Sequence, residues 1–133
     1  MPPRLLLDTH IAVRWTTETK KLTREQARSL EGSVRRTELI ALSAVTLLEI
    51  AMLAGDGRIK LRMSLNEFFD ELQANPVFQV LPVTYDVAIE AASLGTLRDP
   101  ADRAIVATAR VHGLRLVTSD QRIIESGLVP IVA

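Results

Sequence analysis

Cysteine is absent from the sequence, and aromatic residues are scarce. None of the 133 residues is a cysteine, which excludes disulfide bonds, thiolate metal sites and cysteine nucleophiles. Phenylalanine, tryptophan and tyrosine together make up 4% of the chain, too few to form an evident stacking platform for nucleic-acid bases. The two histidines, His10 and His112, have no triad partner at a recognisable spacing. We therefore expect neither of them to act as a ligand or a base.

The chain also lacks an excess of charge of one sign and a long apolar run. Sixteen basic and 16 acidic residues give a net charge of zero, which argues against a simple basic nucleic-acid binder. The longest apolar stretch, Ala44–Ala54, is interrupted by Glu49, and the run Leu5–Leu7 ends at Asp8. Neither stretch is a signal peptide or a membrane span. We therefore expect a cytoplasmic protein with no membrane partner.

What is present suits an ordinary globular domain, with 47% hydrophobic and 24% charged residues. The length suits one domain, residues 1–133, that buries a proper core. Short apolar runs typical of buried strands recur at residues 4–7, 39–42, 78–81, 114–118 and 129–132. Pro130 cannot donate a hydrogen bond to a central ladder, so the last run is expected to be an edge strand.

Helix signals fill the segments between these runs. Thr23 and Ser64 each begin a capping box, with Gln26 and Glu67 three residues later. Capping residues and terminal glycines predict helices at residues 9–16, 23–36, 43–55, 64–75, 84–95 and 99–113. Strands that alternate with helices predict an α/β fold, a three-layer α/β/α domain with a mainly parallel central sheet.

Four acidic residues occupy positions that should bring them together. Asp8 and Asp120 follow the first and fourth predicted strands, at the edge of an open α/β sheet where ligands bind. Glu49 is the only charged residue in an apolar helical stretch, and Asp102 lies three, four and seven residues before apolar ones. Both are expected to point inward. Asp99 is a fifth candidate, although capping of the helix explains it without a ligand.

Carboxylates held within several Ångströms of one another repel. At ~4 Å each pair costs about 4 kcal/mol at an effective dielectric of ~20, so such a cluster takes up protons or cations. Carboxylates without histidine or cysteine favour hard divalent ions, above all Mg²⁺ or Mn²⁺, which can promote hydrolysis of a phosphodiester. The alternative for each acid is structural: helix capping for Asp8 and Asp102, a raised pKa or a cationic partner for Glu49, and a turn for Asp120.

Together, four stretches resemble PIN-domain ribonucleases of the VapC toxin type. They are Leu5–Thr9, the serine-capped helix with Glu49, Asp99–Ala109 and Leu116–Asp120. Their order and spacing are ordinary for that family. The resemblance implies an endoribonuclease that depends on Mg²⁺ or Mn²⁺, is usually a homodimer, and is held inactive by a small antitoxin encoded beside it. It also implies a catalytic and metal-binding site made of Asp8, Glu49, Asp102 and Asp120, with Asp99 as a further candidate metal ligand.

Two other classes of protein stay open. A response-regulator receiver also places carboxylates and Mg²⁺ at a sheet edge, but it needs an acidic pair after the first strand and a lysine after a late one. Here Asp8 stands alone, and Ser119-Asp120 occupies the late position. The second alternative is a catalytically inactive PIN-like module that binds RNA or protein, against which the retention of every acid argues.

The basic residues indicate how an RNA substrate would bind. Setting the five candidate acids aside leaves 11 of the 16 acidic residues against 16 basic ones. We expect the loop residues Arg58, Lys60 and Arg62 to hold the RNA backbone. Arg103 is expected to form a surface ion pair.

The scarce large apolar residues suggest where a second copy would bind. One small core is not expected to bury all of Ile11, Trp15 and the Phe68-Phe69 pair, and those left exposed are candidates for the dimer interface. For Ile11 and Trp15 the core is the alternative. Local hydrogen bonds within turns are expected for Thr9, Thr118 and Ser119.

Overall fold

A sheet of five parallel strands forms the centre of the computed structural model, which describes residues 1–133. The strands are β1 (Leu5–Leu7), β2 (Ile40–Ser43), β3 (Phe78–Leu81), β4 (Arg115–Val117) and β5 (Ile131–Val132). Their order across the sheet is β3-β2-β1-β4-β5. β1 and β2 are buried along their whole length, as is typical of parallel strands covered on both faces. The sequence prediction that the strand after Pro130 lies at an edge is confirmed.

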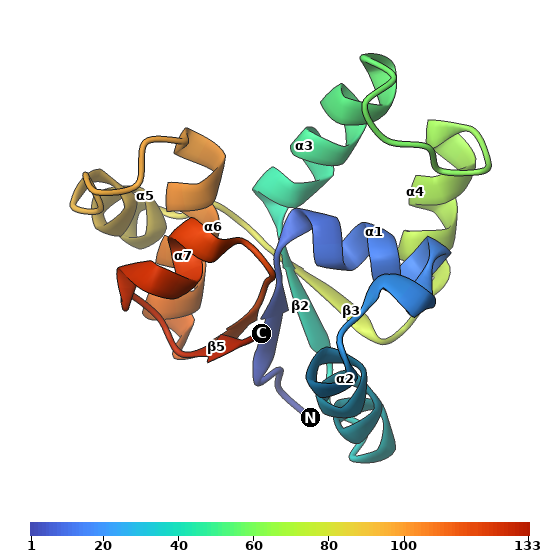
Figure 1. Ribbon diagram of the computed structural model, residues 1–133, viewed down its shortest axis with the longest axis horizontal. Helices are drawn as coiled ribbons and strands as arrows, with labels where there is room; N and C mark the ends of the chain where they lie inside the picture. The colour runs from blue at the N-terminus through green and yellow to red at the C-terminus, as the bar shows by residue number, and fades with distance from the viewer.

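Seven α-helices surround the sheet (Figure 1). They are α1 (Thr9–Thr17), α2 (Arg24–Arg35), α3 (Ala44–Gly55), α4 (Leu65–Ala74), α5 (Tyr85–Ala92), α6 (Pro100–His112) and α7 (Gln121–Ser126), with a 3₁₀ turn, η1 (Thr19–Lys21), between α1 and α2. Both predicted capping boxes form, at Thr23 and Ser64. The sequence analysis missed η1 and α7, which are short. No helix has the length and apolar composition needed to cross a lipid bilayer.

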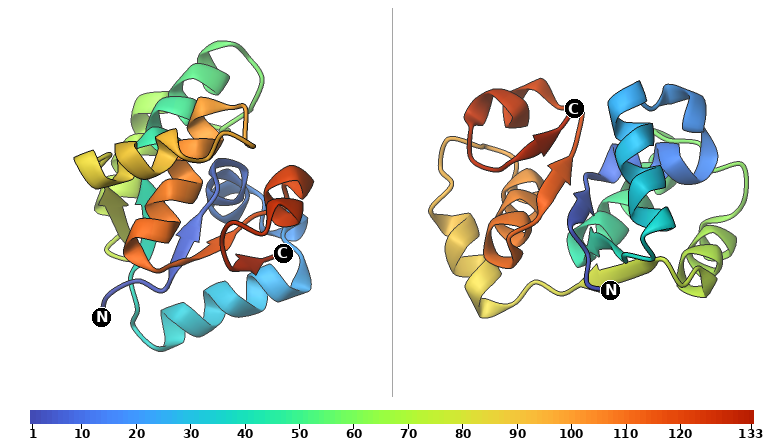
Figure 2. Two further views of the ribbon diagram at one scale, coloured as in Figure 1. Left: turned by 90° about the vertical axis from the view of Figure 1, so that its left-hand side faces the viewer. Right: turned by 90° about the horizontal axis from the view of Figure 1, so that it is seen from below.

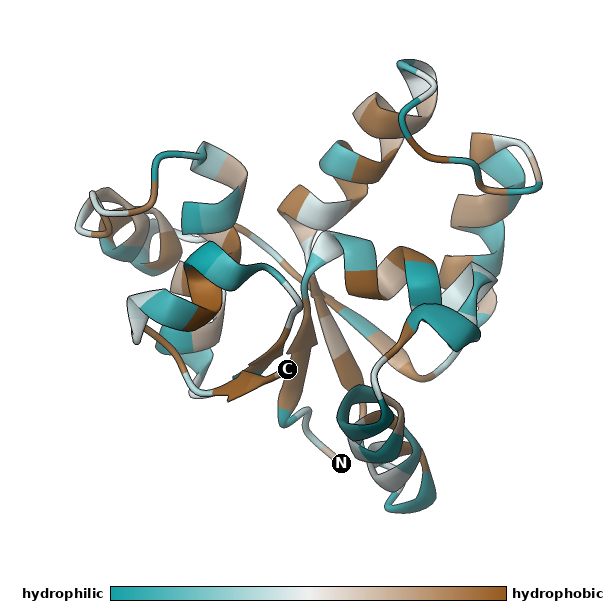
Figure 3. Ribbon diagram, in the orientation of Figure 1, coloured by the Kyte–Doolittle hydropathy of each residue, from teal (hydrophilic) through white to brown (hydrophobic).

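Side chains of the strands alternate between two cores, one on each face of the sheet. Leu6 of β1 packs in a core with α5, α6 and α7, whereas Leu5 and Leu7 pack in a core with α1 and α2. Figure 2 shows the sheet between these two sets of helices, and the strands are the most apolar part of the ribbon in Figure 3. A smaller cluster joins α3 to α4 through Ile50 and Phe68. The predicted three-layer α/β/α architecture is confirmed.

The carboxyl ends of the central strands lead directly into helices. β1 is followed directly by Asp8, β2 ends at Ser43, and β4 is followed at a short distance by Asp120. Each of these residues is the N-cap of the next helix, and its side-chain oxygen accepts a backbone N–H bond. Because all strands are parallel, these helix N-termini lie at one edge of the sheet.

The predicted dimer residues are largely buried within the chain. Ile11 has 0% and Phe68 has 2% of its surface exposed, and Trp15 packs edge-on against Phe78 with ring centres 5.6 Å apart. Ile11 and Phe68 belong to two buried clusters and so are not available for a dimer interface, whereas Trp15 and Phe69 stay half-buried, in line with the expectation that not all four are buried. The exposed large apolar residues lie elsewhere and include Leu48, Met52, Tyr85 and Ile89.

Candidate active site

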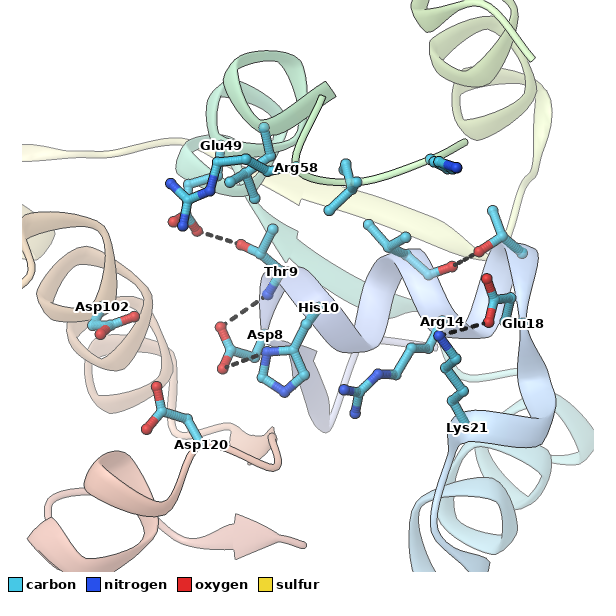
Figure 4. Close-up of a pocket in the computed structure, with 15 residues that line it drawn as sticks. Asp8, Thr9, His10, Arg14, Glu18, Lys21, Glu49, Arg58, Asp102 and Asp120 are labelled. Carbon is cyan, nitrogen blue, oxygen red and sulfur yellow. Dashed lines mark hydrogen bonds and ion pairs between the residues drawn. The ribbon is translucent and has the colours of Figure 1, made fainter. Parts of the chain in front are cut away.

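Four of the predicted acids line one hollow at the carboxyl edge of the sheet (Figure 4). We call it the acidic hollow, and its volume is about 460 Å³. Asp8 follows β1, Glu49 belongs to α3, Asp102 lies in the first turn of α6, and Asp120 precedes α7. Four separate elements thus contribute one carboxylate each, as the sequence analysis expected from their positions.

Asp8 is held in place by hydrogen bonds on both carboxylate oxygens. The residue is 4% exposed. Its Oδ1 accepts from the Thr9 backbone N–H at 2.9 Å, which caps α1, and its Oδ2 accepts from the Thr118 hydroxyl at 2.6 Å. The Thr118 hydroxyl also accepts from the Asp120 N–H at 3.0 Å. Thr118 therefore joins two of the acids, whereas the sequence analysis expected only a local turn bond.

Glu49 is partly buried and has no cationic partner within ion-pair distance. Its Oε1 accepts from the Thr9 hydroxyl at 2.5 Å, and Thr9 also contacts the Thr46 hydroxyl at 3.2 Å. Burial raises the pKa of Glu49, and the nearby charges of Asp8 and Asp99 add to this rise. The expectation of a merely local bond for Thr9 is wrong, because its side chain bridges α1 to α3.

Asp102 has the most strongly perturbed pKa in the acidic hollow. Burial, followed by the negative charges of Asp99, Asp8 and Asp120, raises the pKa of Asp102 to about 7. The rise is the expected response of a partly buried carboxyl group to neighbours of like charge. Perturbed pKa values of this kind cluster at functional sites.

Arg122 lies between two of the acids and was not predicted from the sequence. Its Nη2 is 3.1 Å from Oδ2 of Asp120 and 3.6 Å from Oδ2 of Asp102. The hydrogen bond from Arg122 holds the pKa of Asp120 below its ordinary value. Asp120 also caps α7 by accepting the Arg122 backbone N–H at 2.9 Å. Arg122 thus offsets part of the negative charge of Asp102 and Asp120 from outside the acidic hollow.

His10 takes part in the hydrogen bonding around the acids. Its Nε2 accepts from the Ser119 backbone N–H at 3.1 Å, and its Nδ1 lies 3.5 Å from Oδ2 of Asp8. An accepting Nε2 assigns the proton of the neutral ring to Nδ1, on the side of Asp8. Burial lowers the pKa of His10, which favours this neutral form. Ser119 is further held by Gln26, whose Nε2 donates to its hydroxyl at 2.9 Å.

Asp99 does not line the acidic hollow. It is exposed and caps α6, where its Oδ1 accepts the N–H groups of Ala101 at 2.8 Å and Asp102 at 3.3 Å. Its charge still contributes to the raised pKa of Asp102. Arg103 forms no ion pair but donates to the Leu97 carbonyl, so the expectation of a surface ion pair is wrong. This contact ties the first turn of α6 to the loop before it.

A basic rim lies on the α1 side of the acidic hollow. Arg58 and Lys60 line it, as the sequence analysis proposed for that loop, together with Arg14 and Lys21. Arg14 and Lys21 come from α1 and η1 and were missed, because nothing in their spacing distinguishes them from surface residues. Arg62 does not line the hollow, although its Nη2 lies 4.0 Å from Oε1 of Glu18, a further acid that does line it.

The donor atoms of the acidic hollow fit a hard divalent cation. Its acids offer carboxylate oxygens, and the chain has no cysteine. In this arrangement no three acidic or histidine side chains lie close enough together to hold one ion. Arg122 and the raised pKa of Asp102 compensate the repulsion instead. Side chains therefore have to turn for several carboxylates to share an ion.

Comparisons with known proteins agree with this geometry. The PIN domain family model matches residues 5–127. The chain is 34% identical to Ribonuclease VapC22 of Mycobacterium tuberculosis over 121 residues, which cover 90% of this chain and 88% of that protein. Its fold resembles VapBC2 from Rickettsia felis bound to a promoter DNA fragment, with a TM-score of 0.70, 17% identity, and 98% and 97% of the two chains covered. FitAcB from Neisseria gonorrhoeae is similar, with a TM-score of 0.65, 23% identity, and 97% and 96% covered. The match over most of the chain, together with the acids at the sheet edge, shows that this protein belongs to the PIN domain family.

Proposed function

We propose that this protein is a divalent-metal-dependent endoribonuclease and the toxin of a toxin–antitoxin pair. The observation that carries the proposal is the meeting of four carboxylates, from four elements, in one hollow with a basic rim. The ribonuclease activity in the name of the 34% identical relative supports the same conclusion. A purely structural role does not account for four acids in one hollow of which only Asp102 and Asp120 have an arginine partner.

Asp8, Glu49, Asp102 and Asp120 would hold Mg²⁺ or Mn²⁺. When bound, such an ion activates water and stabilises the charge that develops on a phosphodiester during hydrolysis. The residues of the chain prepare this chemistry by fixing the acids. Thr118 orients Asp8, and Thr9 orients Glu49. In the metal-free chain the pKa of Asp102 is about 7, so a bound cation would displace the proton that this carboxyl holds near neutral pH.

The residues of the basic rim would bind the phosphates of the RNA backbone. Arg14, Lys21, Arg58 and Lys60 share the hollow with the acids. A polyanion held by these side chains brings a phosphodiester to the carboxylates despite their negative charge, and contacts of this kind weaken with salt. The rim therefore orients the substrate, while the acids act on it.

An antitoxin is the proposed protein partner. Several of the similar structures are toxin–antitoxin assemblies, such as the toxin-antitoxin complex from Klebsiella pneumoniae. An arginine or lysine of the antitoxin that enters the acidic hollow would pair with the carboxylates and compete with the metal ion. Arg122 already makes such contacts with Asp102 and Asp120 from within the chain. Both partners and the RNA would meet in the cytoplasm.

A homodimer is proposed through helices α3 and α5. Leu48 and Met52 on α3 and Tyr85 and Ile89 on α5 are between 60% and 92% exposed. Within each pair the residues are four positions apart and lie on one side of the helix. Both helices pack against α6, so the two pairs flank one helix. Exposed apolar groups of this size commonly mark an interface.

The proposal is tested by cleavage of a fluorescent RNA with Mg²⁺, with Mn²⁺ and with EDTA. The wild-type chain should cleave only with a metal ion. Asp102→Asn should keep its fold and cleave more than about 100-fold more slowly than the wild-type chain. A loss of that size exceeds the usual effect of removing a residue that contacts only a ligand of the metal. Asp70→Asn, an exposed acid on α4, is the matched control. RNA binding without cleavage by the wild-type chain would instead favour the inactive binding module.

A further inference from the structure

A second charged hollow lies at the opposite edge of the sheet from the acids. It has a volume of about 290 Å³, and four of the eight residues that line it are arginines. We call it the arginine hollow, formed by Arg4, Arg28, Arg36 and Arg115. Arg4 precedes β1 and Arg115 begins β4, and the Arg115 N–H donates to the Arg4 carbonyl at 2.9 Å. Figure 1 shows α2, which carries Arg28, beside this amino-terminal end of β1.

Buried Glu38 fixes two of the four arginines. Glu38 is 4% exposed, and Nε and Nη2 of Arg36 reach its two carboxylate oxygens at 2.9 and 3.1 Å. Nε of Arg4 lies 3.3 Å from Oε2, and the Ser33 hydroxyl donates to Oε1 at 3.2 Å. The ion pair with Arg36 holds the pKa of Glu38 below its ordinary value. Two guanidinium groups are therefore held in place before any ligand arrives.

Gly32 makes room for the Arg36 side chain. Gly32 lies inside α2, and a Cβ atom added there would be 3.0 Å from Nη1 of Arg36. Glycine is unfavourable in a helix interior because of its conformational freedom. Its presence here lets the guanidinium fold back against the helix and line the hollow.

The remaining two arginines have no carboxylate partner. Arg28 and Arg115 form no ion pair, and the one side-chain hydrogen bond of Arg115 runs from its Nη2 to the Ile131 carbonyl at 3.3 Å. Four guanidinium groups and one carboxylate leave three positive charges in one small hollow. The planar guanidinium binds phosphate oxygens in pairs, so a phosphate group is the ligand that this arrangement suits.

We propose that the arginine hollow is a second RNA-binding site, which holds backbone phosphates remote from the bond that is cleaved. This inference rests on the proposed ribonuclease function. Arg4 and Asp8 stand at the two ends of β1, four residues apart, or about 13 Å in an extended strand. An RNA of many nucleotides can reach both ends of the sheet, whereas a very short one bound at the acids cannot. The hollow thus favours long or folded RNA over short fragments.

The test replaces the two unpaired arginines and spares the two that neutralise Glu38. Arg28→Gln/Arg115→Gln is compared with Arg24→Gln/Arg35→Gln, which removes the same charge from exposed positions outside the hollow. Fluorescence anisotropy measures binding of a 24-nucleotide RNA and of a dinucleotide in EDTA, as a function of KCl concentration. Binding in EDTA does not depend on cleavage, so this result is independent of the ribonuclease activity. Circular dichroism and urea unfolding establish that each variant is folded.

Loss of two phosphate contacts predicts a specific pattern. For the 24-nucleotide RNA, Arg28→Gln/Arg115→Gln should weaken binding by about 10-fold at 0.15 M salt and reduce the salt slope by about 1.4. Arg28→Lys/Arg115→Lys should keep most of the slope. The dinucleotide, whose single phosphate cannot span about 13 Å, should lose less affinity than the 24-nucleotide RNA. An equal loss of affinity in Arg28→Gln/Arg115→Gln and in Arg24→Gln/Arg35→Gln would overturn the proposal. So would binding of inorganic phosphate at Arg28 and Arg115 if neither double variant changed the affinity for the 24-nucleotide RNA.

Discussion

At the scale of single residues, Asp102 shows how position alone changes chemistry. It belongs to the first turn of α6, where an acid is ordinarily stabilised by the helix N-terminus. Its surroundings act in the opposite direction, because burial and three neighbouring acids raise its pKa to about 7. Without metal, Asp102 is therefore a destabilising charge at high pH.

This raised pKa predicts how the stability of the metal-free chain depends on pH. The folded chain binds a proton at Asp102 more tightly than the unfolded chain, whose pKa is near 3.8. Its contribution to the free energy of unfolding should therefore fall as pH rises from about 4 to about 7, and stay constant above that range. Urea unfolding in EDTA measures this. The stability of Asp102→Asn relative to wild type should increase over the same range, and parallel pH profiles would contradict the assignment.

Arg122 is the second residue whose role can be tested alone. In the absence of metal its side chain compensates Asp102 and Asp120, and it competes with any cation that binds there. Arg122→Gln should therefore tighten Mn²⁺ binding by about 2- to 5-fold, the range expected for an exposed ion pair. Titration calorimetry measures this, with Arg35→Gln as the control for loss of charge. Weaker binding in Arg122→Gln would mean that Arg122 supports the metal site.

At the scale of elements, the sequence predicted every strand and the six longer helices because two independent signals agreed. Apolar runs of strand length marked the sheet, and side-chain caps such as Thr23, Ser64 and Asp99 marked where helices begin. α7 was missed because it has six residues and a single buried one, Ile123. So short a segment shows no periodicity. In the structure α7 begins at its N-cap, Asp120, whose side chain accepts the Arg122 backbone N–H.

The loop between α3 and α4 carries a prediction at this scale. The sequence treated its three basic residues alike, whereas the structure places Arg58 and Lys60 in the acidic hollow and Arg62 beside Glu18. Arg58→Ala/Lys60→Ala should raise KM for RNA cleavage by about 10-fold at 0.15 M salt with little change in kcat, because two phosphate contacts are lost. Arg62→Ala is the control from the same loop. An equal rise in KM for Arg62→Ala would show that only the net charge matters.

At the scale of the whole molecule, the site follows from topology. Parallel strands bring Asp8 and Asp120 to one edge, and this rule let the sequence predict these two acids of the acidic hollow, whereas Glu49 and Asp102 were predicted from their apolar helical neighbours. Glu18, which also lines the hollow, was not predicted. The contacts of Thr9, Thr118 and Arg122 with these acids could not be predicted in the same way. These contacts depend on which side chains of neighbouring elements face each other, and no spacing in the sequence predicts which ones do.

The assembly proposed for α3 and α5 is tested by mass. Light scattering at micromolar concentration should give about twice 14.7 kDa for the wild-type chain. Leu48→Glu/Ile89→Glu, at exposed positions of the two helices, should give a single chain, because burying the added charges is costly. Val34→Glu on α2 is the control at another exposed apolar residue. A wild-type monomer would remove the dimer and leave the nuclease proposal standing.

The most direct test of the central claim, that the carboxylates act as one site, is a double-mutant comparison of cleavage rates. Single-turnover rates are measured with saturating Mg²⁺ for wild type, Asp8→Asn, Asp102→Asn and the double variant. Residues that act as a unit give strongly non-additive losses. The account predicts that each single variant loses nearly all activity and that the double variant is about as slow as either one. Losses that multiply in the double variant, or wild-type activity in either single variant, would contradict it.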